Sequence, residues 1–347
     1  MQSIKIKLLL LSLMHFATDG LCAYLIFSRL YPDNPTLAVL VFLGYNTLAF
    51  VTQSPVGLVA DKYPKYKLML TVSVLSLALG YLFSGVCLVA VFFIGMGNSI
   101  FHVAGGKYVT DKSGNDISHL GIFVSTGAIG LALGQRYAHS LPLVLSFFGI
   151  IVICLLLMLV SEDEEKKHYQ EEYDADINGK KIALLAIVGV VFARSFVGTI
   201  VSPSFTRGEY TFIILALATA LGKAVGGVVS KLVGTDKAAI VSMSAAAALL
   251  TLGTGNPVTF ALGVFAFNFT MPMTLYYANV VLKGKEGFAF GTLAAFLVPG
   301  SFIAEYFGYT VVFKVVTALL CAASIAVILY VTRRTKTDGS ACTDDNP

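Results

Sequence analysis

The sequence contains little charge. Asp, Glu, Lys and Arg make up 13% of its 347 residues, whereas hydrophobic residues make up 56% and the mean hydropathy is +0.80. Soluble globular domains carry about 25% charged residues, so this composition excludes that class and predicts a membrane protein. The formal net charge of +4 does not indicate a nucleic-acid partner, because the basic residues follow a membrane topology, as described below.

The sequence also lacks the motifs of several kinds of site. Its five cysteines are scattered, mostly through apolar runs, and this spacing excludes a disulfide framework and a paired-cysteine metal site. There is no phosphate-binding glycine loop ending in Lys-Ser/Thr, so transport driven by ATP is not expected. There is also no HExxH or GxSxG motif that would indicate an enzyme. We therefore expect no enzymatic activity, no cofactor and no resident metal.

Long apolar runs predict twelve transmembrane helices. Twelve spans of about 20 residues each require about 240 residues and leave only short loops. We expect them near 4–29, 36–59, 67–84, 86–108, 117–138, 141–160, 181–202, 209–232, 237–254, 257–283, 286–306 and 309–332. The first run follows Lys5 and Lys7, as in a signal sequence. It is too long for one and is interrupted by Asp19, so we interpret it as a retained helix.

The distribution of Lys and Arg orients these helices. With the N-terminus in the cytoplasm, eighteen of the 24 Lys and Arg residues fall on the cytoplasmic side, three on the other side and three within spans. This asymmetry follows the positive-inside rule. Both termini are therefore predicted to lie in the cytoplasm, with the chain in a bacterial-type cytoplasmic (inner) membrane.

Only one connection is long, the charged stretch at 161–181. We interpret it as a cytoplasmic linker between an N-terminal six-helix bundle at 1–160 and a C-terminal six-helix bundle at 182–332. A regulatory or docking segment is the alternative interpretation. The polar residues at 333–347 are predicted to form a disordered cytoplasmic tail.

The two halves repeat each other at a constant offset of 170 residues. Identical residues recur at this spacing across several helices: Gly57 with Gly227, Lys67 with Lys237, Gly85 with Gly255, Asn98 with Asn268, Gly121 with Gly291, and Gly130 with Gly300. The sequence therefore predicts an all-α polytopic membrane protein. Its two parallel-repeat bundles would face each other across a central pathway.

The stretch GLVADKYPKYK, from Gly57 to Lys67, resembles the signature loop between the second and third helices of the major facilitator superfamily. It departs from that pattern at Pro64, where the superfamily usually has Gly. The resemblance covers the whole chain and implies the major facilitator fold and secondary transport. It also implies that Gly57, Asp61, Lys62 and Lys65 form a cytoplasmic gate.

The position of Asp61 at a helix end allows several interactions. Its carboxylate can pair with Lys62 or Lys65, or cap the N-terminus of a neighbouring helix. A turn that holds two helices in one conformation is the alternative to a gate.

Shorter stretches are similar to fosmidomycin-resistance-type exporters within that superfamily. They are HFATD (15–19), GMGNSIFHVAGG (95–106), RSFVGTIVSP (194–203) and LGKAVGG (221–227). The glycines at 127, 130 and 134 are similar to a motif of the superfamily's antiporters, and helix packing is the alternative explanation.

Several ionisable residues are predicted to lie inside the membrane, four of them near one another in depth or on one helix face. Asp19 is about 22 Å along its helix, Arg194 about 20 Å and Lys223 about 21 Å, so all three are expected near the midplane. His15 is four residues before Asp19 and shares its helix face. We interpret Arg194 and Lys223 as binding an anionic or polar substrate, and Asp19, tuned by His15, as taking up and releasing a proton. A structural ion pair between Asp19 and Arg194 is the alternative.

Further substrate contacts are expected from residues that share a helix face or are related by the repeat. Asn98 and His102 share one helix face, Asn268 and Tyr276 share another, and Gln53 is the repeat equivalent of Lys223. His15, Asp19 and His102 are the residues that would ligate a metal if the chain were an intramembrane enzyme, the main rival from another class.

These patterns together favour a monomeric secondary transporter in the lipid bilayer. It would move a small organic solute, anionic or polar, by alternating access with proton coupling. A proton/drug antiporter exporting hydrophobic or cationic compounds is the alternative, and a metal-binding intramembrane enzyme is weaker still. A sensor built on a transporter scaffold would need larger soluble parts. The sequence leaves the substrate and the direction of transport open.

Overall fold

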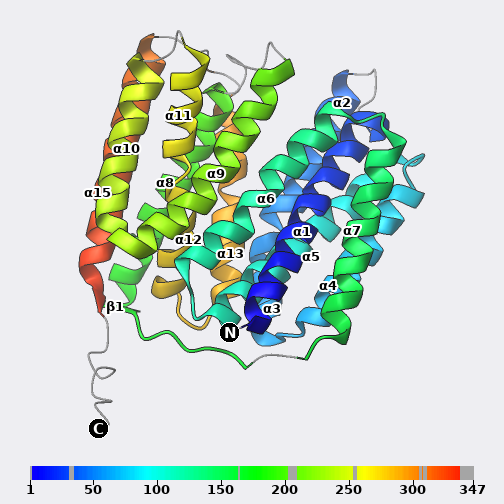
Figure 1. The fold of residues 1–347 in the computed structure, drawn as a ribbon, viewed down its shortest axis with the longest axis horizontal. Coiled ribbons are helices and arrows are strands. Elements are labelled where there is room, and N and C mark those ends of the chain that lie inside the picture. Colours follow the sequence, from blue (N-terminus) through cyan, green and yellow to red (C-terminus); the bar gives the residue numbers. More distant parts are fainter. Residues whose placement is uncertain are drawn as a thin grey trace.

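The structure, a computed structural model, describes residues 2–30, 35–162, 165–201, 209–252, 256–304, 307 and 311–336. These residues are almost entirely helical (Figure 1). The helices are α1 (Gln2–Leu25), α2 (Pro35–Asn46), α3 (Gln53–Lys62), α4 (Tyr66–Leu82), α5 (Cys87–Ser113), α6 (Ile117–Arg136), α7 (Leu141–Val160), α8 (Ile177–Val201), α9 (Glu209–Val233), α10 (Thr235–Leu252), α11 (Pro257–Phe267), α12 (Thr270–Val281), α13 (Glu286–Ala295), α14 (Leu297–Ala304) and α15 (Val311–Arg334). Two short strands, β1 (Glu172–Tyr173) and β2 (Thr335–Lys336), pair antiparallel.

The predicted spans correspond to these helices. Within the described residues, eleven segments are long and apolar enough to cross a membrane, and the remaining predicted span is the shorter apolar helix α4. The chain is therefore a multi-pass membrane protein. The predicted helix boundaries are wrong at α5, which continues five residues beyond 108, and at α8, which begins at Ile177 rather than 181. The predicted span ends at 202, 254 and 306 and the predicted start at 309 lie outside the described residues.

Three of the predicted spans are broken, and each break is explained by a proline. Pro55 follows a π-helical turn over Thr47–Val51, Pro272 follows the break between α11 and α12, and Pro299 follows the break between α13 and α14. Proline has no N–H group for the carbonyl four residues before it. Those carbonyls belong to residues 51, 268 and 295, which is where the three helices are interrupted.

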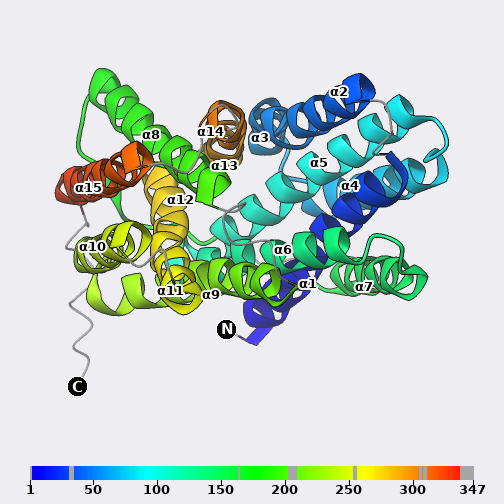
Figure 2. The same cartoon turned by 90° about the horizontal axis from the view of Figure 1, so that it is seen from above.

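The first seven helices lie on one side of the molecule and α8 to α15 on the other (Figure 2). The two sides meet where α6 packs on α9 and where α3 packs on α13. Each meeting requires close backbone contact. A Cβ on Gly57 would lie 2.2 Å from the Gly287 carbonyl oxygen, and a Cβ on Gly227 would lie 2.6 Å from that of Ile117. The second contact is the first one shifted by 170 residues, so the predicted internal repeat is confirmed.

The glycines of α6 bring that helix close to α1. A Cβ on Gly130 would lie 1.8 Å from the Phe16 carbonyl oxygen, and a Cβ on Gly134 would lie 2.1 Å from that of Gly20. The absence of a side chain therefore lets the two backbones touch. Helix packing accounts for these glycines without reference to the direction of transport.

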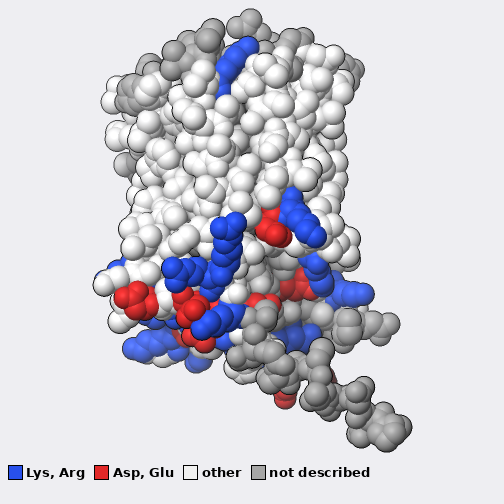
Figure 3. Space-filling model, turned by 90° about the vertical axis from the view of Figure 1, so that its left-hand side faces the viewer, with Lys and Arg blue, Asp and Glu red and all other residues white. Residues whose placement is uncertain are grey.

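Charged side chains gather at one end of the molecule (Figure 3). We call it the charged end; Asp61, Lys107, Asp116, Lys166 and Glu286 lie there, with the N-terminus and the connection between α7 and α8 (Figure 1). Above it in Figure 3 is a broad band without charge, as expected for a surface that faces lipid.

The connection between α7 and α8 packs across the charged end. The Lys167 N–H donates to the Asp111 carbonyl oxygen at 2.7 Å, and the Tyr169 hydroxyl donates to the Asn279 carbonyl oxygen at 2.8 Å. Tyr173 is 1% exposed and lies in β1, which pairs with β2. Two tyrosines of this connection are therefore buried, while most of its other described residues are exposed.

The predicted tail is also partly ordered. Arg333 and Arg334 complete α15, and residues 335 and 336 form β2. The Asp174 N–H donates to the Arg334 carbonyl oxygen at 2.8 Å, so this end of α15 is held by the connection. Residues 337–347 lie outside the described residues.

Replacing Gly130 with Ala should destabilise the protein. Its Cβ would overlap the Phe16 carbonyl, and forcing α1 and α6 apart should cost about 1–3 kcal/mol. The matched control is Gly149→Ala on α7, where a Cβ meets nothing within 4 Å. In detergent, thermal unfolding should occur at a lower temperature for Gly130→Ala only. Equal melting temperatures for the two variants would show that α1 and α6 tolerate a wider separation.

Candidate functional site

A cavity of about 260 Å³ lies between the two halves of the molecule. Its polar wall residues come from helices on both sides: His15, Asp19, Gln53, His102, Arg194 and Lys223. The rest of the wall is apolar and includes Phe50, Met271 and Leu297. These three residues lie at or next to the three proline-induced breaks, so each broken helix contributes to the cavity. In a membrane, irregular backbone is tolerated where it lines such a cavity.

One wall of this cavity carries a compact cluster of two histidines and a carboxylate. His15 Nε2 lies 3.2 Å from Asp19 Oδ2, and His102 Nε2 lies 3.5 Å from Asp19 Oδ1. The two Nε2 atoms are 2.9 Å apart. Asn98 donates its side-chain N–H to Asp19 Oδ1 at 3.1 Å. We call these four residues the histidine cluster.

The backbone fixes the orientation of both imidazole rings. His15 Nδ1 lies 2.7 Å from the Phe123 carbonyl oxygen, and His102 Nδ1 lies 2.9 Å from the Asn98 carbonyl oxygen. Gly127 of α6 packs directly on the cluster, since a Cβ there would lie 2.2 Å from Asp19 Oδ2. The rings are therefore held with both Nε2 atoms toward Asp19.

The ligand-type atoms of His15, Asp19 and His102 lie within 4.8 Å of one another, close enough to surround a metal ion. A tetrahedral zinc ion with bonds of about 2.0–2.1 Å separates two imidazole nitrogens by about 3.3 Å. The observed separation of 2.9 Å is the length of a hydrogen bond. The cluster as it stands is thus hydrogen-bonded rather than arranged around zinc.

The second half of the chain contributes two cations to the cavity wall. Arg194 is 8% exposed. Its guanidinium donates one long hydrogen bond, 3.5 Å from Nη1 to the Thr274 hydroxyl. Among the described residues, no carboxylate lies within ion-pair distance of Arg194 or Lys223. The alternative of an Asp19–Arg194 ion pair is wrong for this structure, because Asp19 is engaged by the two histidines and Asn98.

A second cavity of about 620 Å³ shares Asp19, Arg194 and Lys223 with the first one. Its wall adds polar residues from both halves: Asn46, Gln135, Ser195, Thr199, Thr219 and Asn268. The two cavities are therefore adjacent, with the cations and the carboxylate lining both.

Of the remaining predicted substrate residues, two line the cavities and two do not. Gln53 and Asn268 line the cavities, and the side-chain oxygen of Gln53 is buried without a hydrogen-bond partner. Asn98 lies behind the wall and supports the cluster. Tyr276 lines neither cavity; its carbonyl oxygen accepts from Asn115 near the charged end. Although it was predicted to share a helix face with Asn268, eight residues of helix separate the two by about 12 Å along the axis.

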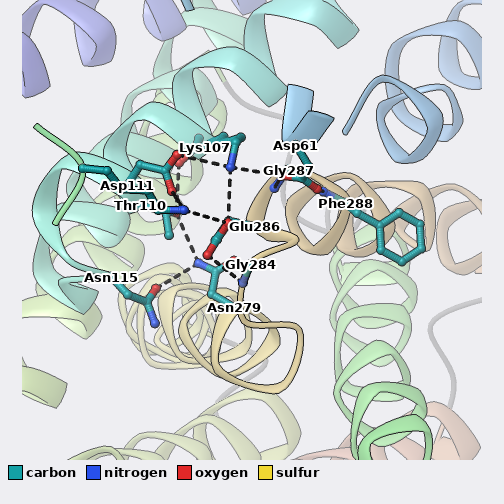
Figure 4. A network of polar contacts seen from close by, with 12 residues as sticks. Asp61, Lys107, Thr110, Asp111, Asn115, Asn279, Gly284, Glu286, Gly287 and Phe288 are labelled. Atoms are coloured by element: carbon teal, nitrogen blue, oxygen red, sulfur yellow. Dashed lines mark hydrogen bonds and ion pairs between the residues drawn. The ribbon is translucent and has the colours of Figure 1, made fainter. Parts of the chain in front are cut away.

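At the charged end, Asp61 links the two halves. Its two carboxylate oxygens accept the backbone N–H groups of Gly287 and Phe288, both at 2.8 Å, and so cap the first turn of α13 (Figure 4). Gly57, one helical turn earlier, permits the contact by packing on Gly287. A carboxylate at a helix N-terminus is favoured by both hydrogen bonding and the helix dipole.

Lys107 is the basic partner of Asp61 and is almost fully buried. Its Nζ lies 3.0 Å from Asp61 Oδ1, 3.2 Å from Asp111 Oδ2 and 3.2 Å from Glu286 Oε2 (Figure 4). Because Glu286 belongs to α13, this ion cluster also crosses between the halves. Burial and the negative charge of Glu286 raise the pKa of the Tyr169 phenol well above its usual value. Tyr169 is therefore a constant hydrogen-bond donor in this network.

The other two residues of the predicted gate lie outside the network. Lys62 and Lys65 are exposed, and among the described residues neither forms an ion pair with Asp61. Lys62 Nζ instead lies 5.2 Å from the centre of the Tyr63 ring. The physical reason is that Asp61 points inward to α13, whereas both lysines point to solvent.

The repeat places a second inter-half ion pair at the charged end. Lys231 is the repeat equivalent of Asp61, and its Nζ lies 2.5 Å from Asp116 Oδ2, at the start of α6. Burial alone would raise the pKa of Asp116, but hydrogen bonds from His119, Lys231 and Ser118 hold it well below its usual range. The carboxylate therefore remains charged across the physiological pH range.

Sequence reasoning missed Lys107, Asp111, Glu286 and Asn279. The signal for the first two was their spacing of four residues on one helix face. Glu286 is the repeat equivalent of Asp116. Because acidic residues are common at the start of helices, its position did not indicate which residue it pairs with. Asn279 bonds to Thr110 and Asn115, about 165 residues away in sequence, and had no local signal.

Comparison with known proteins identifies the fold. No protein-family model and no curated protein matches the sequence. Among solved structures, a variant of the Escherichia coli fucose:proton symporter FucP is 14% identical, covers 94% of this chain and 99% of its own, and has a TM-score of 0.69. FucP in the outward conformation, a Major Facilitator Superfamily transporter, gives 15% identity, the same coverage and a TM-score of 0.70. The human organic anion transporter MFSD10 (TETRAN) gives 12%, the same coverage and 0.63. The chain has the major facilitator fold.

Neutralising Asp61 should open the charged end. Asp61→Asn loses the ion pair with Lys107 and weakens the cap on α13, and losing a buried charge pair costs about 2–5 kcal/mol. A cysteine placed at Thr110, in a background without the native cysteines, should react with a thiol reagent at least about tenfold faster in this variant. Lys62→Gln is the control and should leave the rate unchanged. Equal rates in the two variants would contradict a closing role for Asp61.

The Asp116–Lys231 ion pair should be insensitive to pH in the neutral range. Because its pKa is depressed in the folded protein, Asp116 contributes stability above its unfolded pKa of about 3.9, and this contribution declines as pH falls below that value. Asp116→Asn keeps an acceptor for the α6 cap. The comparison is made in a His119→Gln background, because the His119 imidazole lies 3.2 Å from the Asp116 carboxylate. There Asp116→Asn should lower the melting temperature by about 1–2 °C, constantly from pH 5 to 8, with the gap closing toward pH 3. A gap that varies between pH 5 and 8 would show that Asp116 titrates there.

Proposed function

We propose that the chain is a secondary transporter of the major facilitator superfamily that moves a small organic anion by alternating access. The observation that carries the proposal is a pair of cations, the buried Arg194 and the half-buried Lys223, which face the cavity without a carboxylate partner among the described residues. A buried charge without a counter-charge is costly, so a bound anion would stabilise this arrangement. Arg194 offers two parallel N–H donors to a carboxylate or phosphonate, and Lys223 adds a point charge.

The histidine cluster supports proton coupling. Asp19 lines the same cavity as the two cations, and His15 and His102 contact its carboxylate. A carboxylate and imidazoles at a membrane-embedded cavity are the groups that relay protons in transporters. FucP is a fucose:proton symporter and MFSD10 an organic anion transporter, so both halves of the proposal have counterparts in proteins of this fold.

The charged end is proposed to face the cytoplasm, because eighteen of the 24 Lys and Arg residues were assigned to that side. The structure is then closed to the cytoplasm by the Asp61 cap, the Lys107 ion cluster and the Lys231–Asp116 pair. We keep the inner membrane, the two six-helix units and a monomeric state as predictions. The fosmidomycin-resistance-type subfamily rests on four short stretches of sequence and also stays a prediction.

A proton/drug antiporter is the second candidate. The cavity wall contains many apolar side chains, including Phe50, Met271 and Phe290, which suit a hydrophobic ligand. A cationic drug, however, would meet Arg194 and Lys223 as well as Asp19. The net positive charge of these three groups favours an anion.

A thermal-shift screen tests the proposal. The purified protein is heated with carboxylates, phosphonates, sugars, amines and lipophilic cations, and a ligand at 100 times its dissociation constant should add about 2.7 kcal/mol to stability. We expect anions to stabilise the wild type and the control Lys285→Gln, an exposed residue at the charged end, but not Arg194→Gln. Stabilisation by lipophilic cations alone, undiminished in Arg194→Gln, would favour the antiporter.

A further inference from the structure

The two imidazole rings of the histidine cluster cannot both be neutral in the observed arrangement. Each Nδ1 faces a backbone carbonyl oxygen, Phe123 for His15 and Asn98 for His102. A carbonyl oxygen only accepts, so each Nδ1 carries a hydrogen. In a neutral imidazole the other nitrogen is then an acceptor with a lone pair. Both Nε2 atoms would thus be acceptors.

These two acceptors are 2.9 Å apart. Two lone pairs at that separation repel each other, whereas an N–H···N hydrogen bond has this length. One additional proton resolves the conflict, because it converts one ring to an imidazolium that donates to the other. A proton on Asp19 would not do so, since it would not lie between the nitrogens. The Asp19 carboxylate, 3.2 and 3.5 Å from the two Nε2 atoms, instead supplies the counter-charge.

We propose that His15 and His102 share one proton between their Nε2 atoms, beside the Asp19 carboxylate, and that this proton binds cooperatively with the anionic substrate. The second half of this statement rests on the proposed function; the first half does not. The shared site replaces the simpler expectation that Asp19 itself is the group that takes up the proton. Asp19 then remains ionised and holds the protonated pair.

The charges that face the pair determine the sign of the coupling. The titratable or polar groups around it are Asp19 and Cys22 on α1, Asn98 on α5, Tyr45 on α2, Arg194 on α8 and Lys223 on α9. From α6 the cluster meets the Phe123 carbonyl oxygen and Gly127. Thiols and phenols ordinarily titrate above pH 8, so the formal charges are those of the carboxylate, the two cations and the pair.

With the shared proton, the pair, Asp19, Arg194 and Lys223 sum to +2; without it they sum to +1. An anion in this cavity is therefore attracted more strongly when the proton is present. By thermodynamic reciprocity the anion strengthens proton binding by the same factor. This linkage favours movement of proton and anion in the same direction. A cationic substrate would have the opposite linkage, because it and the proton would repel each other.

The test uses the ligand-free protein and observes the histidines directly. The chain contains five histidines, so the protein labelled with nitrogen-15 at histidine gives a small set of signals by nuclear magnetic resonance. We expect the Nε2 signals of one ring pair to show an N–H···N hydrogen bond at pH 7 and to titrate together. His15→Gln and His102→Gln should each abolish that pattern. The control His139→Gln, an exposed residue, and His119→Gln, which lies at Asp116, should leave it intact.

Two further variants test the coupling without any substrate. Arg194→Gln and Lys223→Gln each remove one positive charge from the cavity, as a bound anion would by neutralisation. We expect the midpoint pH of the shared proton to rise by about half a unit or more in each, with no change in Lys285→Gln. An unchanged midpoint would overturn the cooperative part of the proposal even if the anion site itself is correct. Two rings that stay neutral from pH 5 to 8 would overturn the shared proton.

A bound metal would also overturn it. Elemental analysis of the purified protein should find no stoichiometric divalent metal, and a chelator should leave the histidine signals unchanged. One metal ion per chain that is lost in His102→Gln would show instead that the three ligand-type atoms close around a metal.

Discussion

The structure depends on one constraint of the lipid bilayer, that each backbone N–H and C=O group must find a partner within the protein. Uninterrupted helices meet this constraint, and a break leaves carbonyl groups that need other donors. The breaks before Pro55, Pro272 and Pro299 all lie beside the central cavity. Side chains donate to backbone carbonyl groups beside two of these breaks. Gln53 donates to the Ala49 carbonyl oxygen at 2.7 Å, and Ser195 to that of Leu297 at 2.6 Å. The cavity is thus built where irregular backbone can be tolerated.

The repeat explains the scaffold but not the chemistry placed on it. Equivalent residues make equivalent contacts between the halves, as at Gly57–Gly287 and Gly227–Ile117. The charges differ. On one side Asp61 caps the backbone of α13, and on the other its equivalent Lys231 pairs with Asp116. At the cavity, the first half supplies the histidine cluster and the second half supplies both cations. Two halves of one fold thereby present complementary charges to one central space.

The sequence predicted those features that depend on composition, periodicity and depth. Apolar runs located the spans, the constant offset revealed the repeat, and counting along helices placed Asp19, Arg194 and Lys223 at one depth, where they line one cavity. Contacts between helices distant in sequence could not be predicted. Lys107 was counted only as a basic residue on the cytoplasmic side, because its partners Asp61 and Glu286 lie 46 and 179 residues away. Tyr276 shares a predicted helix face with Asn268 but lines neither cavity, because a shared face does not imply a shared depth. The packing of Tyr169 depends on contacts with distant helices at the charged end, and no local sequence pattern predicts these contacts.

The number of contacts at the charged end limits how the molecule can work. The Asp61 cap, the Lys107 ion cluster, the Lys231–Asp116 pair and the hydrogen bonds of Asn279 all join the two halves there. The proposed alternating access requires that these contacts break and that the open and closed states differ by only a few kcal/mol. Breaking a buried ion cluster without compensation would exceed that difference. Water entering the opened end must therefore solvate Lys107 and Glu286, and new contacts must form between the halves at the opposite end. Polar groups close to water are well suited to this exchange, whereas under the proposed function the charges of Arg194 and Lys223, deep in the cavity, would be compensated by the bound anion in both states.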